Sequence, residues 1–400
     1  MPRLLAYAIE IFTASMTVAA MGYFAVATLA ARMFLFQRRA RAVAFTPPVS
    51  ILKSLKGIDP GMMDAFRSHC RQSYAGEYEL LFGISSADDP AAAAVHELQR
   101  EFPALSIQLI VCPERLGTNG KVSTLVQMLP HARHDYLLIN DSDITVSPLY
   151  LERVMALFRP NDHQTPPKSG PSAGVGMVTA LYRGRAHKTL PSHLEALGIS
   201  TDFMAGVLVS RMFEGGLRFG MGSTLAIPRE VLDKIGGLAP LLDHLADDYE
   251  LGVRVFAAGY RIALCPEAVQ TDIAPYSWRG FVEHQLRWAR TVRDARPGGY
   301  AGLIVTHGLP WALLNVLASG VSLLSLWLLA LCFFLRIAMA MTLGAAVLGD
   351  HQVLADLWLL PLRDLVWMGL WTAGYASNTI VWRGERFLVH HGTLRKEEET

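Results

Sequence analysis

The sequence predicts an α/β domain with a mostly parallel sheet, flanked by membrane-spanning helices. Short apolar, strand-like runs alternate with helix-like stretches between Pro47 and about Ala295, which favours a parallel sheet covered by helices. Apolar stretches that approach or exceed the ~20 residues needed to cross a bilayer lie before and after that region. We expect an N-terminal anchor with a basic flank over residues 1–45, the α/β domain over 46–300, and transmembrane helices with a polar tail over 301–400.

The composition agrees with a membrane-attached chain. Of 400 residues, 52% are hydrophobic and 18% are charged, whereas soluble domains carry about 25% charged residues. The mean hydropathy is +0.28. A net charge of +1 does not favour a nucleic-acid partner. The four cysteines show no C-x-x-C pair and no zinc spacing, so we expect reduced thiols: Cys70, Cys112, Cys265 and Cys332.

The N-terminal apolar stretch, Ile11 to Phe36, predicts an uncleaved membrane anchor. The basic residues that follow, from Arg38 to Arg41, mark the cytoplasmic side of such a helix. The N-terminus should therefore face outward and the α/β domain should lie in the cytoplasm. A cleaved signal peptide is the alternative, but the run is long and lacks a small-residue cleavage site.

Acidic pairs follow two of the first four predicted strands. Because ligands of parallel sheets sit beyond the carboxyl ends of the strands, Asp88, Asp89, Asp141 and Asp143 are candidate ligand-binding residues. A helix begins after Pro90 and covers Ala91 to Glu101. The predicted strands are Val49–Leu52, Glu79–Ile84, Ser106–Val111 and Tyr136–Ile139.

The Asp-Ser-Asp tripeptide after the fourth strand suggests a metal site. Side chains two residues apart along a strand point the same way, so Asp141 and Asp143 repel each other unless a positive charge lies between them. A divalent cation chelated by a nucleotide diphosphate would supply that charge through oxygen ligands. The alternative is a solvated turn.

The second half of the α/β region carries a further acidic pair. A polar loop is expected over 161–174, strands over 175–181 and 219–227, and a helix from Pro228. Asp247 and Asp248 open another helix, where Asp247 can serve simply as an N-cap. The apolar helix-like run from Leu194 to Met212 lies at the membrane face, lines an acceptor groove, or is an ordinary core helix.

Arginines and aromatic residues alternate on a helix predicted from Ser277 to Arg293, which suits a membrane surface or a pyrophosphate. Beyond it, Leu309 to Leu335 predicts a membrane span. The run 337–349 is half the needed length, and 357–382 is a weaker span because it contains Arg363 and Asp364, which we expect to pair. The tail from residue 383 should be frayed.

Lys53 after the first strand, the acidic pairs and Arg287 with Trp288 suit one assembly for sugar transfer from a nucleotide. The strings that carry them resemble family-2-like GT-A glycosyltransferases, most closely the ceramide glucosyltransferase group. They are VSILKSLKGIDP (Val49–Pro60), ADDPA (Ala87–Ala91), GTNGKVSTL (Gly117–Leu125), NDSDI (Asn140–Ile144), ADDYELG (Ala246–Gly252) and HQLRW (His284–Trp288). The stretches 84–99 and 381–387 (VWRGERF) are similar to bacterial enzymes that glycosylate hopanoids, the bacteriohopanetetrol N-acetylglucosaminyltransferases.

The resemblance implies roles for single residues. Asp248 matches the general base, and Arg287 and Trp288 match the end of a (Gln/Arg)-x-x-Arg-Trp motif, in which His284 replaces the first residue. Asp141 and Asp143 match the metal-binding pair, for Mg²⁺ or Mn²⁺. The residues implied to contact the nucleotide sugar are Lys53, Asp88 or Asp89, Lys121, Asp141 and Asp247.

The resemblance also implies an inverting transferase that moves glucose or N-acetylglucosamine from a UDP-sugar to a membrane lipid alcohol such as a hopanoid. It would sit in the bacterial inner membrane with its catalytic domain in the cytoplasm. A ceramide or other glycolipid glucosyltransferase is the nearest alternative. A processive polysaccharide synthase would need more spans than two or three at the C-terminal side, and a non-catalytic lipid-binding protein would not need the carboxylates.

Overall fold

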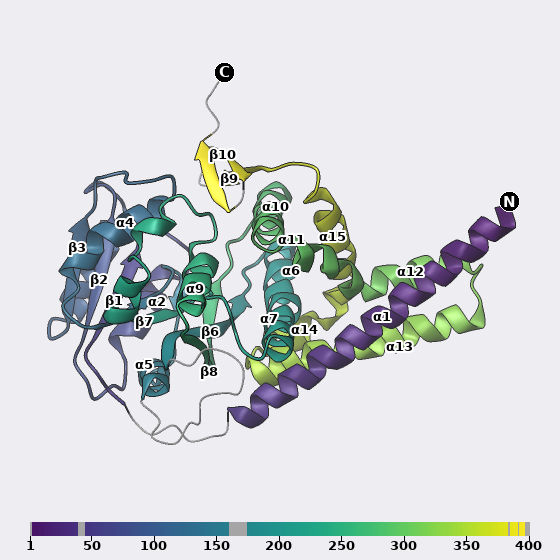
Figure 1. Ribbon diagram of the computed structural model, residues 1–400, viewed down its shortest axis with the longest axis horizontal. Coiled ribbons are helices and arrows are strands. Elements are labelled where there is room, and N and C mark those ends of the chain that lie inside the picture. Colours follow the sequence, from purple (N-terminus) through teal and green to yellow (C-terminus); the bar gives the residue numbers. More distant parts are fainter. Residues whose placement is uncertain (1, 39–44, 160–173, 383–384, 391, 397–400) are drawn as a thin grey trace. The chain divides into compact units, whose positions relative to one another are not determined.

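The structure, a computed structural model, describes residues 2–38, 45–159, 174–382, 385–390 and 392–396 (Figure 1). The predicted polar loop 161–174 lies outside these residues except for Gly174. Part of the basic flank and residues 383–384 of the VWRGERF string also lie outside them.

Two compact units make up the described chain, and each consists of several chain segments. The sheet unit contains residues 45–159, 174–185, 213–274 and 392–396, and the helical unit contains residues 2–38, 186–212, 275–382 and 385–390. The segment 186–212, inside the predicted α/β domain, thus groups with the apolar helices.

The sheet unit is built on an eight-stranded mixed sheet of order β3-β2-β1-β4-β7-β6-β8-β5. The strands β3, β2, β1 and β4 run parallel, as predicted, whereas β7 pairs antiparallel with both β4 and β6. The strands are β1 (Val49–Ser54), β2 (Tyr78–Ile84), β3 (Ser106–Val111), β4 (Tyr136–Ile139), β5 (Ile144–Thr145), β6 (Val175–Arg185), β7 (Leu225–Pro228) and β8 (Arg261–Asp272).

The first strands are buried on both faces, which explains their unbroken apolar runs. Five of the six β1 residues are buried, and so are all but the first residue of β2 and of β4. The four predicted strands and the helix after Pro90 are confirmed. The sheet unit's helices are α2 (Met62–Cys70), α3 (Ala91–Glu101), α4 (Gly120–Met128), α5 (Tyr150–Met155), α8 (Arg229–Lys234) and α9 (Asp247–Ala257).

The helical unit has an apolar core in which α6, α10, α13 and α15 meet. Leu194, Phe281, Ala340 and Leu360 belong to it, and each is fully buried. The unit also contains a hairpin of β9 (Thr379–Trp382) and β10 (Glu385–His390). Its α- and π-helices are α1 (Pro2–Gln37), α6 (Leu190–Gly198), the π-helix η3 (Ile199–Phe203), α7 (Met204–Phe213), α10 (Trp278–Ala295), α11 (Pro297–Gly302), α12 (Gly308–Ala318), α13 (Leu323–Ala340), the π-helix η6 (Met341–Val347), α14 (Gln352–Asp356) and α15 (Leu360–Ala373).

Three helical stretches of the described chain are long and apolar enough to cross a membrane: 3–37, 190–213 and 323–347. A fourth candidate joins 297–306 with 308–318 across a 53° bend. The predicted N-terminal span is confirmed by the length and the apolar composition of its helix. The stretch 190–213 has 56% of its most apolar window buried inside the protein, which agrees with a core helix more than with a lipid-exposed one.

The prediction of one span from Leu309 to Leu335 is wrong. The helix α12 ends at Ala318, and a turn follows in which Gly320 and Val321 have φ of 65° and 64°. The hydroxyl of Ser322 then accepts a hydrogen bond from the Ser325 N–H and caps α13. The run of Ser, Gly and Ser inside the apolar stretch supplies this turn, so the chain forms two helices instead of one.

Two further predictions about the C-terminal region are corrected. Arg363 and Asp364 do not pair with each other: Asp364 binds Arg336, and the nearest carboxylate to Arg363 is Asp202 at 3.5 Å. Their helix α15 has 14 residues, too few for the ~20 of a span. The tail is also not frayed throughout, because β10 and β11 (Thr393–Lys396) form strands within it.

A close approach of backbone to backbone holds α9 in the sheet unit. A Cβ placed on Gly252 would lie 2.2 Å from the Gly220 amide nitrogen and 2.4 Å from the Phe219 carbonyl carbon. Only glycine therefore lets α9 touch the loop before β7. Gly252 lies one helical turn beyond Asp248, on the same face of α9.

Gly252→Ala should lower the free energy of unfolding by about 1–3 kcal/mol, because backbone must move to admit the methyl group. The matched control is Gly120→Ala in α4, where an added Cβ meets nothing within 4 Å. The measurement is unfolding of the purified full chain followed by circular dichroism. An unchanged midpoint for Gly252→Ala would contradict this close packing.

Candidate active site

The candidate site lies where the strand order of the sheet reverses. β1 is hydrogen-bonded to β2 on one side and to β4 on the other, and open α/β sheets bind ligands in the crevice beyond the carboxyl ends at such a point. The chain places Lys53 next to the last residue of β1, Asp88 and Asp89 after β2, and Asp141 and Asp143 after β4. These sequence-predicted residues therefore lie at one end of the sheet.

Asp141 is held by a lysine that it shares with the acidic pair of α9. The Lys121 ammonium lies 2.7 Å from Oδ1 of Asp141 and 3.2 Å from Oδ2 of Asp247. Although burial acts in the opposite direction, the charges of Asp141, Asp247 and Asp248 raise the pKa of Lys121. Because 41% of the Asp141 side chain remains exposed, a ligand can still reach it.

Asp248 faces Asp141 across Gly222. The Gly222 N–H donates to Oδ2 of Asp248 at 2.6 Å, and the Tyr249 N–H donates to Oδ1 at 2.8 Å. A Cβ on Gly222 would lie 2.8 Å from Oδ2 of Asp141 and 3.3 Å from Oδ2 of Asp248. The two carboxylates thus border the space that the missing side chain leaves open.

Burial, and then the charge of Asp247, raises the pKa of Asp248 to about 6. A carboxylate with such a pKa is ionised at neutral pH yet accepts a proton more readily than an exposed aspartate. Asp247 is the first residue of α9, with Ala246 at the N-cap. The alternative that Asp247 serves as an N-cap is therefore wrong.

Asp143 lies deeper than Asp141. It accepts a hydrogen bond from the Thr271 hydroxyl of β8, and burial together with the charge of Asp141 raises the pKa of Asp143 to about 6. Between the two aspartates, the Ser142 hydroxyl donates to Oδ2 of Asp59 at 2.5 Å. The Asp-Ser-Asp segment is consequently tied into the protein on both sides, unlike a solvated turn.

Lys53 contacts the Asp-Ser-Asp segment from the protein interior. Its side chain is fully buried, and its ammonium donates to the Asp141 carbonyl oxygen at 2.9 Å. Burial lowers the pKa of Lys53 to about 7, against the opposing effect of Asp143 and Asp141. The predicted contact of Lys53 with a nucleotide stays a prediction, and its observed contact supports the turn that carries Asp141.

Asp88 and Asp89, which the sequence does not distinguish, have different surroundings. The Asp89 carboxylate accepts hydrogen bonds from the Gly57 N–H at 3.0 Å and the Ala91 N–H at 2.9 Å, so it ties the loop after β1 to the start of α3. Asp88 is exposed. Asp88 is therefore the more accessible of the two to a ligand.

Arg287 and Trp288 belong to α10 of the helical unit. Trp288 packs edge-on against Phe203, with ring centroids 5.6 Å apart. His284, which departs from the family motif, has its Nδ1 3.2 Å from Glu195. The neighbouring arginines of α10 are engaged by the chain: Arg290 donates to the Thr379 carbonyl, and Arg293 donates to the carbonyl oxygens of Gly374 and Ser377 and to Asn378.

The carboxylates fit a divalent cation only in part. Hard cations such as Mg²⁺ and Mn²⁺ prefer oxygen ligands, and Mg²⁺ commonly takes one or two carboxylates together with substrate phosphates and water. Asp141 and Asp143 offer that donor set. Within the described ranges, no group of three His, Cys, Asp or Glu side chains is arranged to hold a metal alone. Ligands other than these side chains, such as water or phosphate oxygens, would have to complete the coordination.

The sequence reasoning missed Gly220, Gly222 and Thr271. The glycine-rich string Phe219–Ser223 is visible in the sequence, and glycine where backbone approaches a functional group is its available signal. Thr271 lies in a long strand with no motif to mark it. Its role follows only from the pairing of β5 with β8, in which Ile144 lies opposite Thr271.

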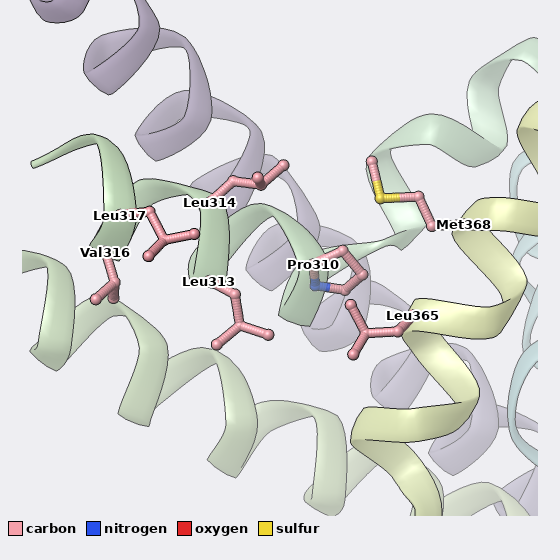
Figure 2. A pocket seen from close by; sticks show the side chains of 7 residues that line it. All are labelled: Pro310, Leu313, Leu314, Val316, Leu317, Leu365 and Met368. Atoms are coloured by element: carbon pink, nitrogen blue, oxygen red, sulfur yellow. The ribbon is translucent and has the colours of Figure 1, made fainter.

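An apolar groove lies elsewhere, in the helical unit, between α12 and α15 (Figure 2). Its volume is about 430 Å³, and its lining has no ionisable side chain: Pro310, Leu313, Leu314, Val316, Leu317, Leu365 and Met368. The groove suits hydrocarbon rather than acid–base chemistry.

Comparison with known proteins confirms the expected fold. A mannosyltransferase of Pyrobaculum calidifontis, solved in complex with GDP-Man and Mn²⁺, matches 92% of this chain and 97% of its own, with a TM-score of 0.53 and 18% identity. Ceramide glucosyltransferase 3 of Caenorhabditis elegans is 24% identical over 61% of this chain and 50% of its own. An N-acetylglucosaminyltransferase of Bradyrhizobium diazoefficiens is 23% identical over 64% and 51%.

The chain spans about half the length of these curated relatives. The predicted resemblance to the ceramide glucosyltransferase group is confirmed. Residues 12–395 match the family described as Glycosyl transferase family 21, which covers both the carboxylate site and the apolar helices. The chain therefore belongs to glycosyl transferase family 21.

Proposed function

We propose that the protein transfers a sugar from a UDP-sugar to a membrane lipid alcohol, with inversion at the anomeric carbon. The observation that carries this proposal is the placement of Asp248 opposite Asp141 across Gly222. One carboxylate is exposed enough to join in binding a metal–diphosphate. The other is buried, with a pKa raised to about 6, as a general base requires.

In the reaction, the acceptor hydroxyl oxygen forms a bond to the anomeric carbon while the bond from that carbon to the diphosphate breaks. The hydroxyl proton moves to Asp248, and the leaving UDP keeps the bonding electron pair. A single displacement of this kind inverts the configuration. A divalent cation held by Asp141, Asp143 and the diphosphate would stabilise the charge that develops on the leaving group.

The remaining site residues have donor-binding roles in this proposal. Asp88 or Asp89 contacts the nucleoside. Lys121 neutralises the acidic cluster and reaches the diphosphate, Asp247 orients Lys121, and Lys53 supports Asp141 from below. Arg287 and Trp288 contribute from α10, where a guanidinium suits a pyrophosphate.

The helices and the relatives support a membrane location and a lipid acceptor. Helices long enough to cross a bilayer and an apolar groove suit a lipid substrate, and the relatives include ceramide glucosyltransferases and an N-acetylglucosaminyltransferase. We assign glucose or N-acetylglucosamine as the sugar and a hopanoid such as bacteriohopanetetrol as the acceptor. The protein would lie in the bacterial inner membrane, with the sheet unit in the cytoplasm and Mg²⁺ or Mn²⁺ as cofactor.

Asp248→Asn should lower kcat by about 10²–10⁴-fold, because the amide cannot accept the proton. The substitution keeps an oxygen for the Gly222 or Tyr249 N–H, so the fold should persist. UDP release by purified protein in the presence of lipid acceptor measures the effect, with Asp233→Asn on the exposed face of α8 as the matched control. Turnover near that of the unmodified protein would remove Asp248 from the base role.

Asp141→Ala should abolish both transfer and its dependence on metal, because one of the two metal ligands is lost. Binding of Mn²⁺ to protein plus UDP, followed by electron paramagnetic resonance, provides a measurement that does not depend on turnover. We expect the bound Mn²⁺ signal to disappear in Asp141→Ala and to remain in Asp248→Asn. An active variant that is still stimulated by metal would place the metal elsewhere.

A further inference from the structure

The helical unit contains a buried cluster of charged side chains that the proposed chemistry does not use. Arg336 lies near the middle of the apolar stretch 323–347, and Asp202 lies in the stretch 190–213. The helix α15 adds Arg363 and Asp364. Ionisable residues inside apolar helices are costly and commonly mark functional sites.

Arg336 is the centre of this cluster, and its Nε and Nη2 atoms are hydrogen-bonded. Its Nε and Nη2 donate to the Asp364 carboxylate at 3.0 and 2.8 Å, and Nη2 also donates to Oδ1 of Asp202 at 2.6 Å. The Arg336 side chain is only 1% exposed. Three helical segments are thereby joined through one guanidinium, which gives the cluster a structural role.

Arg363 differs from Arg336 because two of its three guanidinium nitrogens, Nε and Nη1, are buried without hydrogen-bond partners among the described residues. Its side chain is 4% exposed, and the nearest carboxylate oxygen, Oδ2 of Asp202, is 3.5 Å from Nη2. Among the described residues, Nε and Nη1 of Arg363 have no partner, and neither has Nη1 of Arg336 nor Oδ2 of Asp202. Buried donors left unpaired are strongly destabilising.

The fold nevertheless provides space for the Arg363 side chain. A Cβ on Gly198 would lie 2.2 Å from Nη2 and 2.4 Å from Nε of Arg363, so the glycine of α6 makes room for the guanidinium. The ring of Trp367 covers Arg363, with 5.0 Å from the guanidinium carbon to the ring centroid. The Asp202 side chain keeps 25% exposure, although its Oδ2 atom is buried.

The charges and the unpaired atoms restrict what the ligand can be. Arg336 and Arg363 are offset by the carboxylates of Asp202 and Asp364, and Glu195 also acts electrostatically on Arg363. No net positive charge remains to attract an anion. Three guanidinium nitrogens need oxygen acceptors for their N–H groups, and one carboxylate oxygen needs a donor. An uncharged group with several hydroxyls supplies both.

We propose that Arg363, together with Nη1 of Arg336 and Oδ2 of Asp202, binds the hydroxyl groups of an uncharged lipid headgroup. The site itself stands on the geometry of the helical unit alone. Its identification with the acceptor rests on the proposed function. The acceptor class is then a lipid with a neutral polyol headgroup rather than a phosphate-bearing one.

The experiment measures thermal unfolding of the full chain in phosphatidylcholine nanodiscs without any nucleotide sugar. Added monooleoylglycerol, which has an uncharged headgroup with two hydroxyls, should raise the unfolding midpoint. Methyl oleate, which has no hydroxyl, and phosphatidic acid, which is anionic, should not. Arg363→Met should abolish the shift with monooleoylglycerol, whereas the control Arg279→Met, at an arginine whose side chain is 89% exposed, should retain it.

An equal shift in Arg363→Met, or no shift in the unmodified protein, would overturn the site. A shift caused by phosphatidic acid and lost in Arg363→Met would show an anion site instead and would also overturn it. If Arg363→Met does not fold, Arg363→Lys replaces it, because lysine keeps the charge but loses the planar set of donors. Arg363→Lys should then reduce the shift.

Transfer kinetics separate this inference from the proposed function. Arg363→Lys should raise KM for the lipid acceptor about tenfold, as expected for loss of hydrogen bonds from a charged donor, and leave KM for the UDP-sugar unchanged. Lipid binding that depends on Arg363 in a protein without transferase activity would contradict only the proposed function. Transfer with an unchanged KM for the acceptor would contradict only the headgroup site.

Discussion

The gathering of like charges beyond β1 and β4 is the constraint on which the site depends. Four carboxylates, Asp141, Asp143, Asp247 and Asp248, lie at this end of the sheet, and their mutual repulsion must be offset. Lys121 does so from above through its contacts with Asp141 and Asp247. Lys53 donates to the Asp141 carbonyl oxygen from the buried side and so holds the turn that carries Asp141. The site is therefore prepared for a further cation and for a diphosphate that would share Lys121.

Two glycines, which have no side chain, allow the backbone to pack closely enough for these carboxylates to lie together. Gly252 lets α9 lie against the loop before β7, and Gly222 in that loop separates Asp141 from Asp248 while binding Asp248 through its N–H. The C-terminal strand contributes too, because the Leu245 N–H donates to Gly392 O and the Leu394 N–H to Asp243 O. The loop that leads into α9 is thus also held by the C-terminal segment.

Local patterns in the sequence were sufficient for much of the fold. Buried strands such as Tyr136–Ile139 carry unbroken apolar runs, and the acidic residues that follow them stand out against this background. The opposition of Asp248 and Asp141 across Gly222 could not be predicted in the same way, because it depends on the antiparallel placement of β7 beside β4. Such long-range pairing leaves no periodic signal.

In the apolar C-terminal region, local sequence patterns gave wrong predictions for one helix and for one charge pair. Hydropathy alone joins α12 and α13 into one span, although Ser319 to Ser322 form a turn between them. Proximity along the chain likewise pairs Arg363 with its neighbour Asp364. Residues adjacent along a helix point in different directions, so Asp364 meets Arg336 and Arg363 is left for another partner. Tertiary contacts, rather than sequence proximity, decide how charges in apolar helices are paired.

The central claim, inverting transfer to a membrane lipid by the carboxylate site, is tested most directly by the product. Membranes that contain the protein are incubated with Mn²⁺ and either UDP-glucose or UDP-N-acetylglucosamine, and the lipid extract is examined by mass spectrometry and NMR. The account predicts a lipid alcohol that carries one added sugar in β-linkage, because these donors are α-linked, and predicts its absence with Asp248→Asn. An α-linked product, a sugar polymer, or the same product from Asp248→Asn would contradict it.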